Sequence, residues 1–226
     1  MKLLHLKNVP ILEQLCLEEA LLRTDKENWL ILNSGSTPAV VFGISGKVEE
    51  HLSHVVTLPL IRRFSGGGTV VVDEETLFAT VICNESDAGC KPFPHEILHY
   101  VAGFYEQILP EGFAARENDF TLHGRKFGGN AQCIVKGRWL HHSTLLWDYC
   151  TERMSLLKMP PKMPTYRQMR PHSEFLTTLK THFADKADFM SRLKEAFGAL
   201  EEISQEEALA LSCRPHRKAT HLISHA

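Results

Sequence analysis

The sequence predicts an α+β domain, with a mixed, largely antiparallel β-sheet flanked by helices. Segments of strand length, rich in branched residues, follow one another with turn residues between them. Helical spacing of apolar residues appears before, between and after these segments, but strands and helices do not alternate regularly, as they do in a doubly wound parallel sheet. The 226 residues are 43% hydrophobic, which supplies enough apolar surface for one sizeable core.

The first half of the chain is expected to open on a helix and to continue as strands. Apolar residues follow helical spacing from Ile11 to Arg23, with glutamates at polar positions between them. Strand-length segments follow at 29–32, 39–42, 55–61, 68–72 and 77–83. The four residues 73–76 separate the last two segments and predict a hairpin between them.

The second half is expected to begin with a helix at 94–109, which Pro110 and Gly112 end. Further strands are predicted at 120–122, 131–135 and 139–147, the last two joined by a turn at 136–138. Helical patterns return at 175–183, 189–197 and 205–211. The predicted domain therefore spans 1–211, and a frayed C-terminal tail follows at 212–226.

Composition and charge exclude several classes of protein. The 25 lysines and arginines face 27 aspartates and glutamates, so no basic surface for nucleic acid is expected. No apolar run reaches the ~18 residues that a membrane span needs, so a membrane is not an expected partner either. Six widely spaced cysteines without a C-x-x-C pair indicate free thiols in a reducing compartment. Met1–Pro10 shows no targeting segment, so the expected location is cytoplasmic, with a mitochondrial or plastid one left open for a processed form.

Two glycine-rich stretches combine glycine with fixed positive charge. They read R-R-F-S-G-G-G-T at 62–69 and G-R-K-F-G-G-N-A-Q at 124–132. Backbone N–H groups without side chains can approach a ligand closely, and a guanidinium beside them can hold a phosphate or a carboxylate. Neither stretch matches a Walker P-loop or a G-x-G-x-x-G dinucleotide loop. The alternative for the first stretch is a hairpin turn with solvated arginines.

Four motifs occur in order along the chain: R-R-F-S-G-G-G-T-V at 62–70, E-N-D at 117–119, G-R-K-F-G-G-N-A-Q at 124–132 and H-H-S-T-L-L at 141–146. Together they resemble the lipoate-protein ligase A family of the biotin/lipoate ligases, and the resemblance covers residues 12–172. It implies the catalytic-domain fold of that family. It also implies an enzyme that joins lipoate to ATP, giving lipoyl-adenylate and pyrophosphate, and then passes the lipoyl group to a lysine of a lipoyl domain.

The same resemblance implies the small molecules and partners of the reaction. ATP and Mg²⁺ would be the cofactors and lipoate the substrate, with no metal-ligand cluster in the chain itself. The acceptors would be lipoyl domains of 2-oxoacid dehydrogenase E2 subunits or the H protein of the glycine-cleavage system.

By motif position, the resemblance gives Lys126 the central catalytic role. Its ammonium group would hydrogen-bond the lipoate carbonyl and the α-phosphate together and stabilise the charge that develops in both half-reactions. Arg63 would hold the phosphates, and Asn118 and Asp119 would lie near the adenylate, although an Asn-Asp pair by itself is more often a turn. The implied binding residues are Arg63, Ser65, Gly66, Gly67, Gly68, Thr69, Val70, Val71, Asn118, Asp119, Lys126, Gly128, Asn130 and His142.

Two features stay open on sequence alone. His141 and His142 are adjacent, so on a strand they point to opposite faces, and only one of them can reach a small site. Either histidine could be a general base. The segment from Met159 to Pro171 has no acidic residue, and Lys158, Lys162, Arg167 and Arg170 lie in or beside it. These cations could hold phosphate, dock an acidic lipoyl domain or belong to an exposed loop.

The chain departs from the family pattern in three respects. Gly128 stands where the family usually has serine, Ser143 stands where it usually has glycine, and no accessory domain like that of the bacterial ligases follows the last predicted helix. One alternative is therefore a transferase that needs a separate accessory protein or accepts only preformed lipoyl-AMP. A second is octanoyl or lipoyl transfer from a carrier protein through a thioester on Cys133 or Cys150, the thiols nearest the motifs. A third is a non-catalytic, lipoyl-binding relic.

Overall fold

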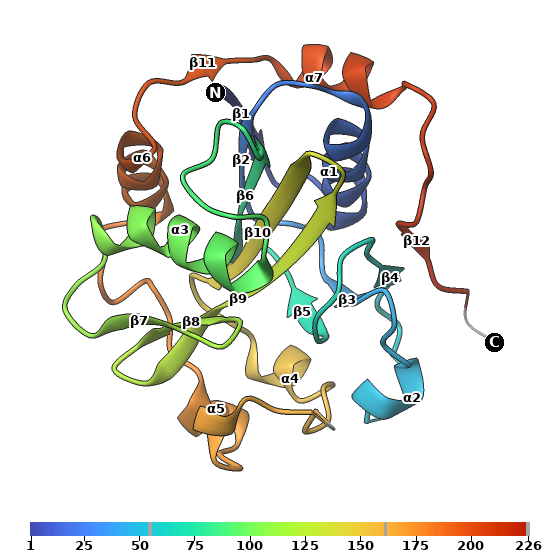
Figure 1. Cartoon of the computed structure of the whole chain (residues 1–226). Coiled ribbons are helices and arrows are strands. Elements are labelled where there is room, and N and C mark those ends of the chain that lie inside the picture. Colours follow the sequence, from blue (N-terminus) through green and yellow to red (C-terminus); the bar gives the residue numbers. More distant parts are fainter. Residues whose placement is uncertain (54–55, 161, 225–226) are drawn as a thin grey trace.

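The computed structural model describes residues 1–53, 56–160 and 162–224, which form two β-sheets with helices around them (Figure 1). The larger sheet has eight strands in the order β11-β1-β2-β6-β10-β9-β8-β7, and the smaller has four in the order β12-β4-β3-β5. The larger sheet contains β1 (Lys2–Lys7), β2 (Trp29–Ser34), β6 (Thr76–Asn84), β7 (Phe113–Arg116), β8 (Asp119–Leu122), β9 (Arg125–Val135), β10 (Arg138–Leu146) and β11 (Glu201–Glu202). The smaller contains β3 (Ala39–Phe42), β4 (Leu60–Arg62), β5 (Val70–Val72) and β12 (His221–Leu222).

The pairing confirms the predicted mixed, largely antiparallel sheet. Within the described strands of the larger sheet, β1 runs parallel to β2 and to β11, and the remaining pairs are antiparallel. In the smaller sheet β3 and β4 are parallel, and β5 and β12 join them antiparallel. The predicted hairpin at 136–138 is confirmed, because β9 and β10 pair from Val135 and Arg138 onward.

Helices cover both faces of the larger sheet. The helices α1 (Ile11–Thr24) and α7 (Gln205–Ser212) pack together on one face, and α3 (Pro94–Glu106) and α6 (Lys186–Ala196) pack on the other (Figure 1). Four single-turn elements lie in the lower part of the view: α2 (Val48–His51), α4 (Thr151–Met154), α5 (His172–Phe175) and the 3₁₀ turn η1 (Thr165–Arg167). None of the described helices is long and apolar enough to cross a membrane.

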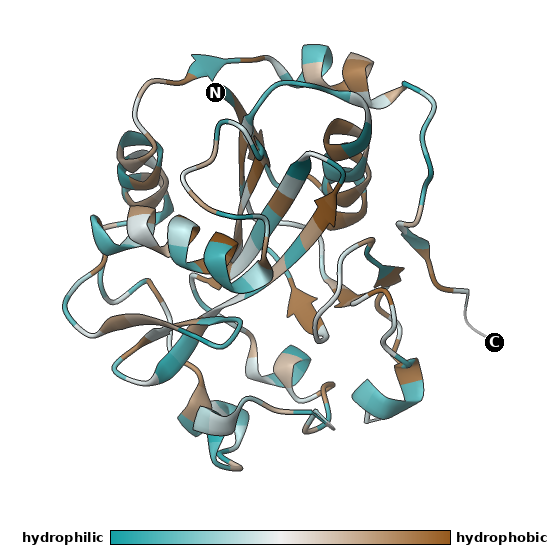
Figure 2. Ribbon diagram, viewed as in Figure 1, coloured by the Kyte–Doolittle hydropathy of each residue, from teal (hydrophilic) through white to brown (hydrophobic). Residues whose placement is uncertain are grey.

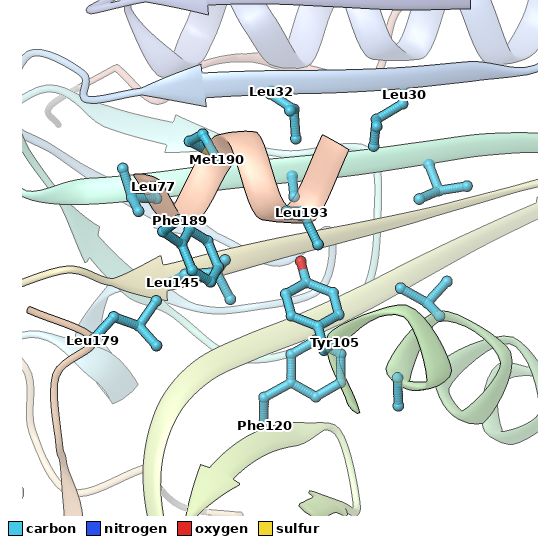
Figure 3. Close-up of a cluster of buried hydrophobic side chains, with 14 of the residues drawn as sticks. Leu30, Leu32, Leu77, Tyr105, Phe120, Leu145, Leu179, Phe189, Met190 and Leu193 are labelled. Atoms are coloured by element: carbon cyan, nitrogen blue, oxygen red, sulfur yellow. The ribbon is translucent and has the colours of Figure 1, made fainter. Parts of the chain in front are cut away.

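Strand β2 shows how the core is divided by the sheet. Leu30 and Leu32 point toward α3 and α6, where they join Tyr105 and Leu193 (Figure 3). Trp29 and its alternate neighbours point toward α1 instead. Each fully buried side chain of this size contributes roughly 1.5–3 kcal/mol. Because both faces are covered, the central strands are continuous apolar runs, visible as brown segments in Figure 2.

The predicted hairpin of 68–72 and 77–83 is wrong. Strand β5 pairs with β3 in the smaller sheet, whereas β6 pairs with β2 and β10 in the larger one. The turn between them, closed by a hydrogen bond from the N–H of Thr76 to the carbonyl of Asp73 (3.1 Å), carries the chain from one sheet to the other. Buried apolar runs do not encode their pairing partner, so the sequence pattern could not distinguish the two arrangements.

The predicted helix at 175–183 is also wrong, because α5 ends at Phe175. Farther along, the N–H of Leu179 donates to the carbonyl of Leu146 (2.9 Å), which holds this segment against the end of β10. Phe175 and Leu179 are buried in different apolar clusters. Their spacing imitates a helix although the chain between them is irregular.

The C-terminal tail is not frayed where the structure describes it. The N–H groups of Ala219 and Thr220 donate to the buried carboxylate of Glu19 on α1, at 2.9–3.0 Å. Strand β12 then pairs with β4 at the edge of the smaller sheet. The tail therefore buttresses the sheet that carries the first glycine-rich stretch.

Other boundaries shift by several residues. Strand β4 begins at Leu60, and residue 55 of the predicted strand 55–61 lies outside the described residues. Strand β9 begins at Arg125 rather than at 131, so the second glycine-rich stretch lies largely within a strand. Strands β1 and β7 were not expected from the pattern.

Candidate active site

A cavity of about 710 Å³ lies where α1, the smaller sheet and strands β8 to β10 meet. Its outer wall comes from the covering segment, defined here as residues 157–160 and 162–176. Among the predicted site residues, those that line the cavity are Arg63, Gly67, Gly68, Thr69, Val70, Val71, Asn118, Asp119, Lys126, Gly128, Asn130 and His142. Ser65 and Gly66 belong to the same glycine-rich loop (residues 65–69) without lining the cavity. The fold thus brings both glycine-rich stretches to one place, and the roles of the individual residues stay predictions.

The glycine-rich loop is held from inside by Arg63. Its Nε donates to Ser65 Oγ (3.0 Å) and to the carbonyl of Gly66 (3.1 Å), and its Nη2 donates to the carbonyl of Gly68 (2.9 Å). Burial lowers the pKa of the Arg63 guanidinium to about 10, which leaves it charged at neutral pH. These hydrogen bonds fix the shape of the loop. Contact between Arg63 and a phosphate group remains a prediction.

Two glycines allow this loop to pack closely. A Cβ on Gly43, which follows β3, would lie 2.1 Å from the carbonyl oxygen of Gly67. Gly67 itself has φ +91°, a backbone conformation that side chains with a Cβ rarely adopt. Within the triple glycine the geometry therefore requires Gly67, whereas a Cβ on Gly66 or Gly68 would meet open space. Arg63 is buried, so the alternative of a hairpin turn with solvated arginines does not hold for it.

A chain of buried hydrogen bonds joins this loop to α1. His142 Nε2 lies 2.8 Å from Ser65 Oγ, and His142 Nδ1 lies 2.9 Å from Glu18 Oε2. The other oxygen of Glu18 accepts from the side chains of Gln14 and Thr80, both at 2.7 Å. Glu18 is not recognisable as a site residue from the sequence, because a glutamate on an amphipathic helix is expected at the exposed face. Its side chain is only 1% exposed.

His141 points to the opposite face, as its position next to His142 on a strand predicts. Its Nδ1 lies 3.0 Å from Gln132 Nε2, and its Nε2 lies 3.2 Å from Asn130 Oδ1. Burial lowers the pKa of His141 to about 3, with a smaller contribution from the charge of His142. A fully enclosed, neutral imidazole has no access to substrate, so His141 is a structural residue.

Lys126 forms an ion pair inside the cavity rather than projecting from a turn. Its Nζ lies 2.7 Å from Asp119 Oδ1, on the neighbouring strand β8. The register of β8 and β9 shifts between Phe120 and Thr121, which marks a β-bulge opposite Lys126. Bulges of this kind re-aim side chains next to functional sites. The second Asp119 oxygen accepts from the hydroxyl of Tyr166, at 2.7 Å.

Gly128 and Ser143, the two positions that differ from the expected family pattern, lie on the paired strands β9 and β10. A Cβ on Gly128 would lie 2.8 Å from Leu145 Cδ2 and 3.3 Å from Phe120 Cβ, so a serine there would require the buried Leu145 side chain to shift. Ser143 lies on the paired strand, on the same face, and its Oγ donates to Asn130 Oδ1 (2.6 Å). A hydroxyl next to the second glycine-rich stretch is therefore present, supplied from the other strand.

The thiols named for a thioester route lie away from this arrangement. No cysteine is found among the described residues that line the cavity. Cys133 packs against the apolar cluster under α1, and burial raises the pKa of its thiol. Cys150 lies near Glu152, with its Sγ 3.0 Å from that carboxylate.

The two sheets and the helices on both faces of the larger one make this an α+β protein, and the cavity beside the glycine-rich loop is its candidate small-molecule site. The chain belongs to the lipoyl protein ligase A/B catalytic domain family, whose sequence model matches residues 10–198. It is 24% identical over 234 aligned positions to "Inactive lipoate--protein ligase 2" of Plasmodium falciparum (isolate 3D7), an alignment that covers 75% of this chain and 61% of that protein. The chain spans about half to three fifths of the length of the first curated relatives it matches.

Solved structures give the same fold. A lipoate-protein ligase A bound with ATP superimposes with a TM-score of 0.72 at 18% identity, over 93% of this chain and 92% of that one. A bi-partite lipoate protein ligase from Thermoplasma acidophilum, studied with its E2 lipoyl domain, superimposes with a TM-score of 0.71 at 18% identity, over 93% and 89% of the two chains. At these identities the likeness establishes the architecture, and the predicted catalytic-domain fold is confirmed.

Proposed function

We propose that this protein activates lipoate with ATP and transfers the lipoyl group to a lysine of a lipoyl domain. The observation that carries the proposal is the position of Lys126, which lies in a cavity shared by the glycine-rich loop and by Asn118 and Asp119. Family membership supports lipoate attachment as the chemistry. The ATP-bound and E2-associated relatives support the nucleotide and the acceptor class.

The cavity has walls that suit the two parts of a lipoyl-adenylate. Leu15, Val41, Val70 and Phe78 supply apolar surface, and each methylene of an acyl chain buried there contributes about 0.8 kcal/mol. Thr69 lines the same cavity, and its Oγ1 is buried without a hydrogen-bond partner among the described residues. A polar ligand atom would satisfy it.

In the proposed mechanism Lys126 leaves Asp119 for the reacting groups. The ammonium group would hydrogen-bond the lipoate carboxyl oxygen and the α-phosphate, which aligns them and offsets the negative charge that develops as pyrophosphate departs. When the neutral acceptor amine attacks the acyl carbon, the same ammonium would stabilise the oxyanion, which collapses as AMP leaves and the nitrogen gives up its proton to solvent. Asp119 stays close enough to take Lys126 back after product release.

Magnesium fits this site only as part of the ATP complex. No group of three or more potential ligands from His, Cys, Asp and Glu occurs among the described residues. Asp119 and Glu117 line the cavity, and Mg²⁺ in nucleotide sites commonly takes one or two carboxylates together with substrate phosphates and water. We therefore place the metal with the nucleotide rather than in a site of the protein.

A narrower activity, transfer from preformed lipoyl-AMP, is the second candidate. It is favoured by the name of the relative called inactive and by the division of the Thermoplasma ligase into two parts. In that case a separate accessory protein would supply or complete the activation step. The acceptors would remain lipoyl domains of E2 subunits or the glycine-cleavage H protein.

One set of reactions separates these activities. The purified chain is mixed with an apo lipoyl domain and given lipoate with Mg·ATP, synthetic lipoyl-AMP, or octanoyl carrier protein without ATP, and the acceptor is followed by intact mass. The proposal expects a lipoyl adduct in the first two reactions and its loss in Lys126→Ala. An adduct with lipoyl-AMP alone supports the narrower activity. Modification from the carrier without ATP, sensitive to Cys150→Ser, would show the thioester route instead.

A further inference from the structure

The transfer half of the proposed reaction needs a group that accepts a proton. The attacking nitrogen carries one proton more than the amide that it forms, and a positioned base at this step contributes about 10²–10⁴-fold to the rate. The sequence left His141 and His142 open for this role. His141 is fully enclosed, and both ring nitrogens of His142 are engaged, one by Ser65 and the other by Glu18.

Two carboxylates at the Lys126 end of the cavity are engaged as well. Asp119 is paired with Lys126 Nζ (2.7 Å) and accepts a hydrogen bond from the hydroxyl of Tyr166 (2.7 Å). Glu117 Oε1 accepts the backbone N–H of Thr165 (2.6 Å). A histidine with a ring nitrogen available is therefore the more suitable proton acceptor at neutral pH.

Two other titratable residues of the cavity belong to α2, beside the smaller sheet. Glu50 is paired with Lys47 (3.0 Å), and the ring of His51 packs edge-on against Phe42 of β3, with 6.2 Å between the ring centroids. Lys126 belongs to β9 of the larger sheet. The search for a base near Lys126 therefore leads to a different element.

His172 begins α5, lines the cavity and is half-buried. Its helix is docked on the strand that carries Lys126: the N–H of Thr177 donates to the carbonyl of Lys126 (2.8 Å), and Leu176 pairs with Lys126 as a parallel β-bridge. None of the side-chain hydrogen bonds in the described covering segment involves the His172 ring. The ring nitrogens are thus available on the cavity side of α5.

The surroundings of His172 favour its neutral form. Arg167 of η1 is only 3% exposed, with its guanidinium 4.7 Å from the ring centroid of Phe175, so the interpretation of this stretch as an exposed loop does not hold there. Burial lowers the pKa of His172, and the positive charges of Arg167 and of Lys126, which is paired with Asp119, lower it further. A neutral imidazole keeps a lone pair that can take up a proton at neutral pH.

We propose that His172 accepts the proton that the acceptor nitrogen loses during lipoyl transfer and passes it on to solvent. The assignment rests on the proposed function, in its transfer half. As the C–N bond forms, the C–O bond to AMP breaks and AMP leaves with that electron pair. One N–H bond gives its proton to the His172 ring, and its electron pair stays on the amide nitrogen. The activation half needs no such base, because the lipoate carboxylate is already ionised at neutral pH.

The test measures the two half-reactions separately on the full chain. Transfer from preformed lipoyl-AMP is followed by the intact mass of an apo lipoyl domain between about pH 5 and pH 8, with the rate without the protein subtracted. Activation is followed by the pyrophosphate released from lipoate and Mg·ATP in a single turnover. The variant is His172→Gln, with His172→Asn in its place if the glutamine variant does not fold.

Two control variants accompany them. His182→Gln replaces an exposed histidine. Arg125→Gln removes an exposed hydrogen bond to the carbonyl of Ser173 in α5 and leaves His172 in place. Both controls should match the wild type in both half-reactions.

His172→Gln should slow transfer about 100-fold near neutral pH, within the range of a lost general base, and change activation by less than about twofold. The ratio of the wild-type rate to the variant rate should be constant above pH 6.5, the ordinary pKa of histidine, because His172 is neutral there. It should shrink as the pH falls below the lowered pKa of His172, since a protonated imidazole cannot accept a second proton.

Three results would overturn the assignment: equal transfer rates in the wild type and His172→Gln, equal losses in transfer and activation, or a rate ratio that stays the same at every pH. The first would show that His172 takes no part, the second a structural role, and the third a role other than that of a base. Failure of the proposed function looks different, because the wild type itself would then show no transfer from lipoyl-AMP above the rate without the protein.

Discussion

Burial of His141 predicts that the protein loses stability as the pH falls below 6.5. The folded state holds the ring fully buried and neutral, with a pKa lowered to about 3, whereas the unfolded chain takes up a proton near the ordinary histidine pKa of 6.5. Between these values the unfolded state binds more protons, so the free energy of unfolding decreases as the pH decreases. One pKa unit corresponds to about 1.4 kcal/mol, and the unfolded ring is half protonated at pH 6.5, so about 2 kcal/mol from this group is lost between pH 6.5 and pH 4.5.

The assay is urea unfolding of the wild type, His141→Gln and His182→Gln at several pH values from 4.5 to 7.5. The glutamine at 141 cannot be protonated, so this variant should show a shallower decrease than the wild type, whatever its stability at neutral pH. His182 is exposed, and its variant should follow the wild type. An equally steep decrease in His141→Gln and the wild type would refute the reasoning.

Three further substitutions test the site. Glu18→Gln should lower the free energy of unfolding by about 1–3 kcal/mol, because it disturbs a buried acceptor of three side-chain hydrogen bonds. The control Glu13→Gln, on the exposed side of α1, should change this free energy little, and equal effects of the two variants in a thermal melt would contradict the buried network. Gly67→Ala should lower the free energy of unfolding by about 1–2 kcal/mol, because position 67 has a positive φ. Gly66→Ala, where a Cβ meets open space, should lower it less in the same thermal melt, and the reverse order would contradict the loop geometry. Tyr166→Phe removes the hydroxyl that donates to the Asp119 carboxylate, so hydrogen exchange of the backbone amides in residues 165–170 should become about tenfold faster. Unchanged exchange would show that this hydrogen bond does not hold the covering segment in place.

The sequence predicted the fold class because burial imposes a visible pattern. The strands at 29–32 and 77–83 and the helices at 11–23 and 94–109 all occur close to the predicted positions. What the pattern could not predict is which buried strand pairs with which, as the wrong hairpin between 68–72 and 77–83 demonstrates. The eight-stranded order depends on contacts between distant segments, and these have no local signature.

In the candidate site, too, local motifs were predictable and contacts between distant residues were not. The glycine-rich stretches and Lys126 were recognised from local composition and motif order, and the structure places them at one cavity. Glu18 was missed, because its partner His142 lies more than a hundred residues away in the chain. Arg167 could be identified only as one of several cations in a basic segment. Its burial against the ring of Phe175 follows from tertiary packing, which the sequence pattern does not reveal.

The central claim is that Lys126 catalyses lipoyl attachment in this cavity. The most direct measurement is the intact mass of an apo lipoyl domain after incubation with the purified chain, lipoate and Mg·ATP, with parallel reactions that contain Lys126→Ala or the control Arg125→Gln. We expect a lipoyl adduct with the wild type and with Arg125→Gln, and at least ~100-fold slower formation with Lys126→Ala, as expected for the removal of a group that stabilises transition-state charge. An adduct that forms as fast with Lys126→Ala as with the wild type would contradict a catalytic role for Lys126.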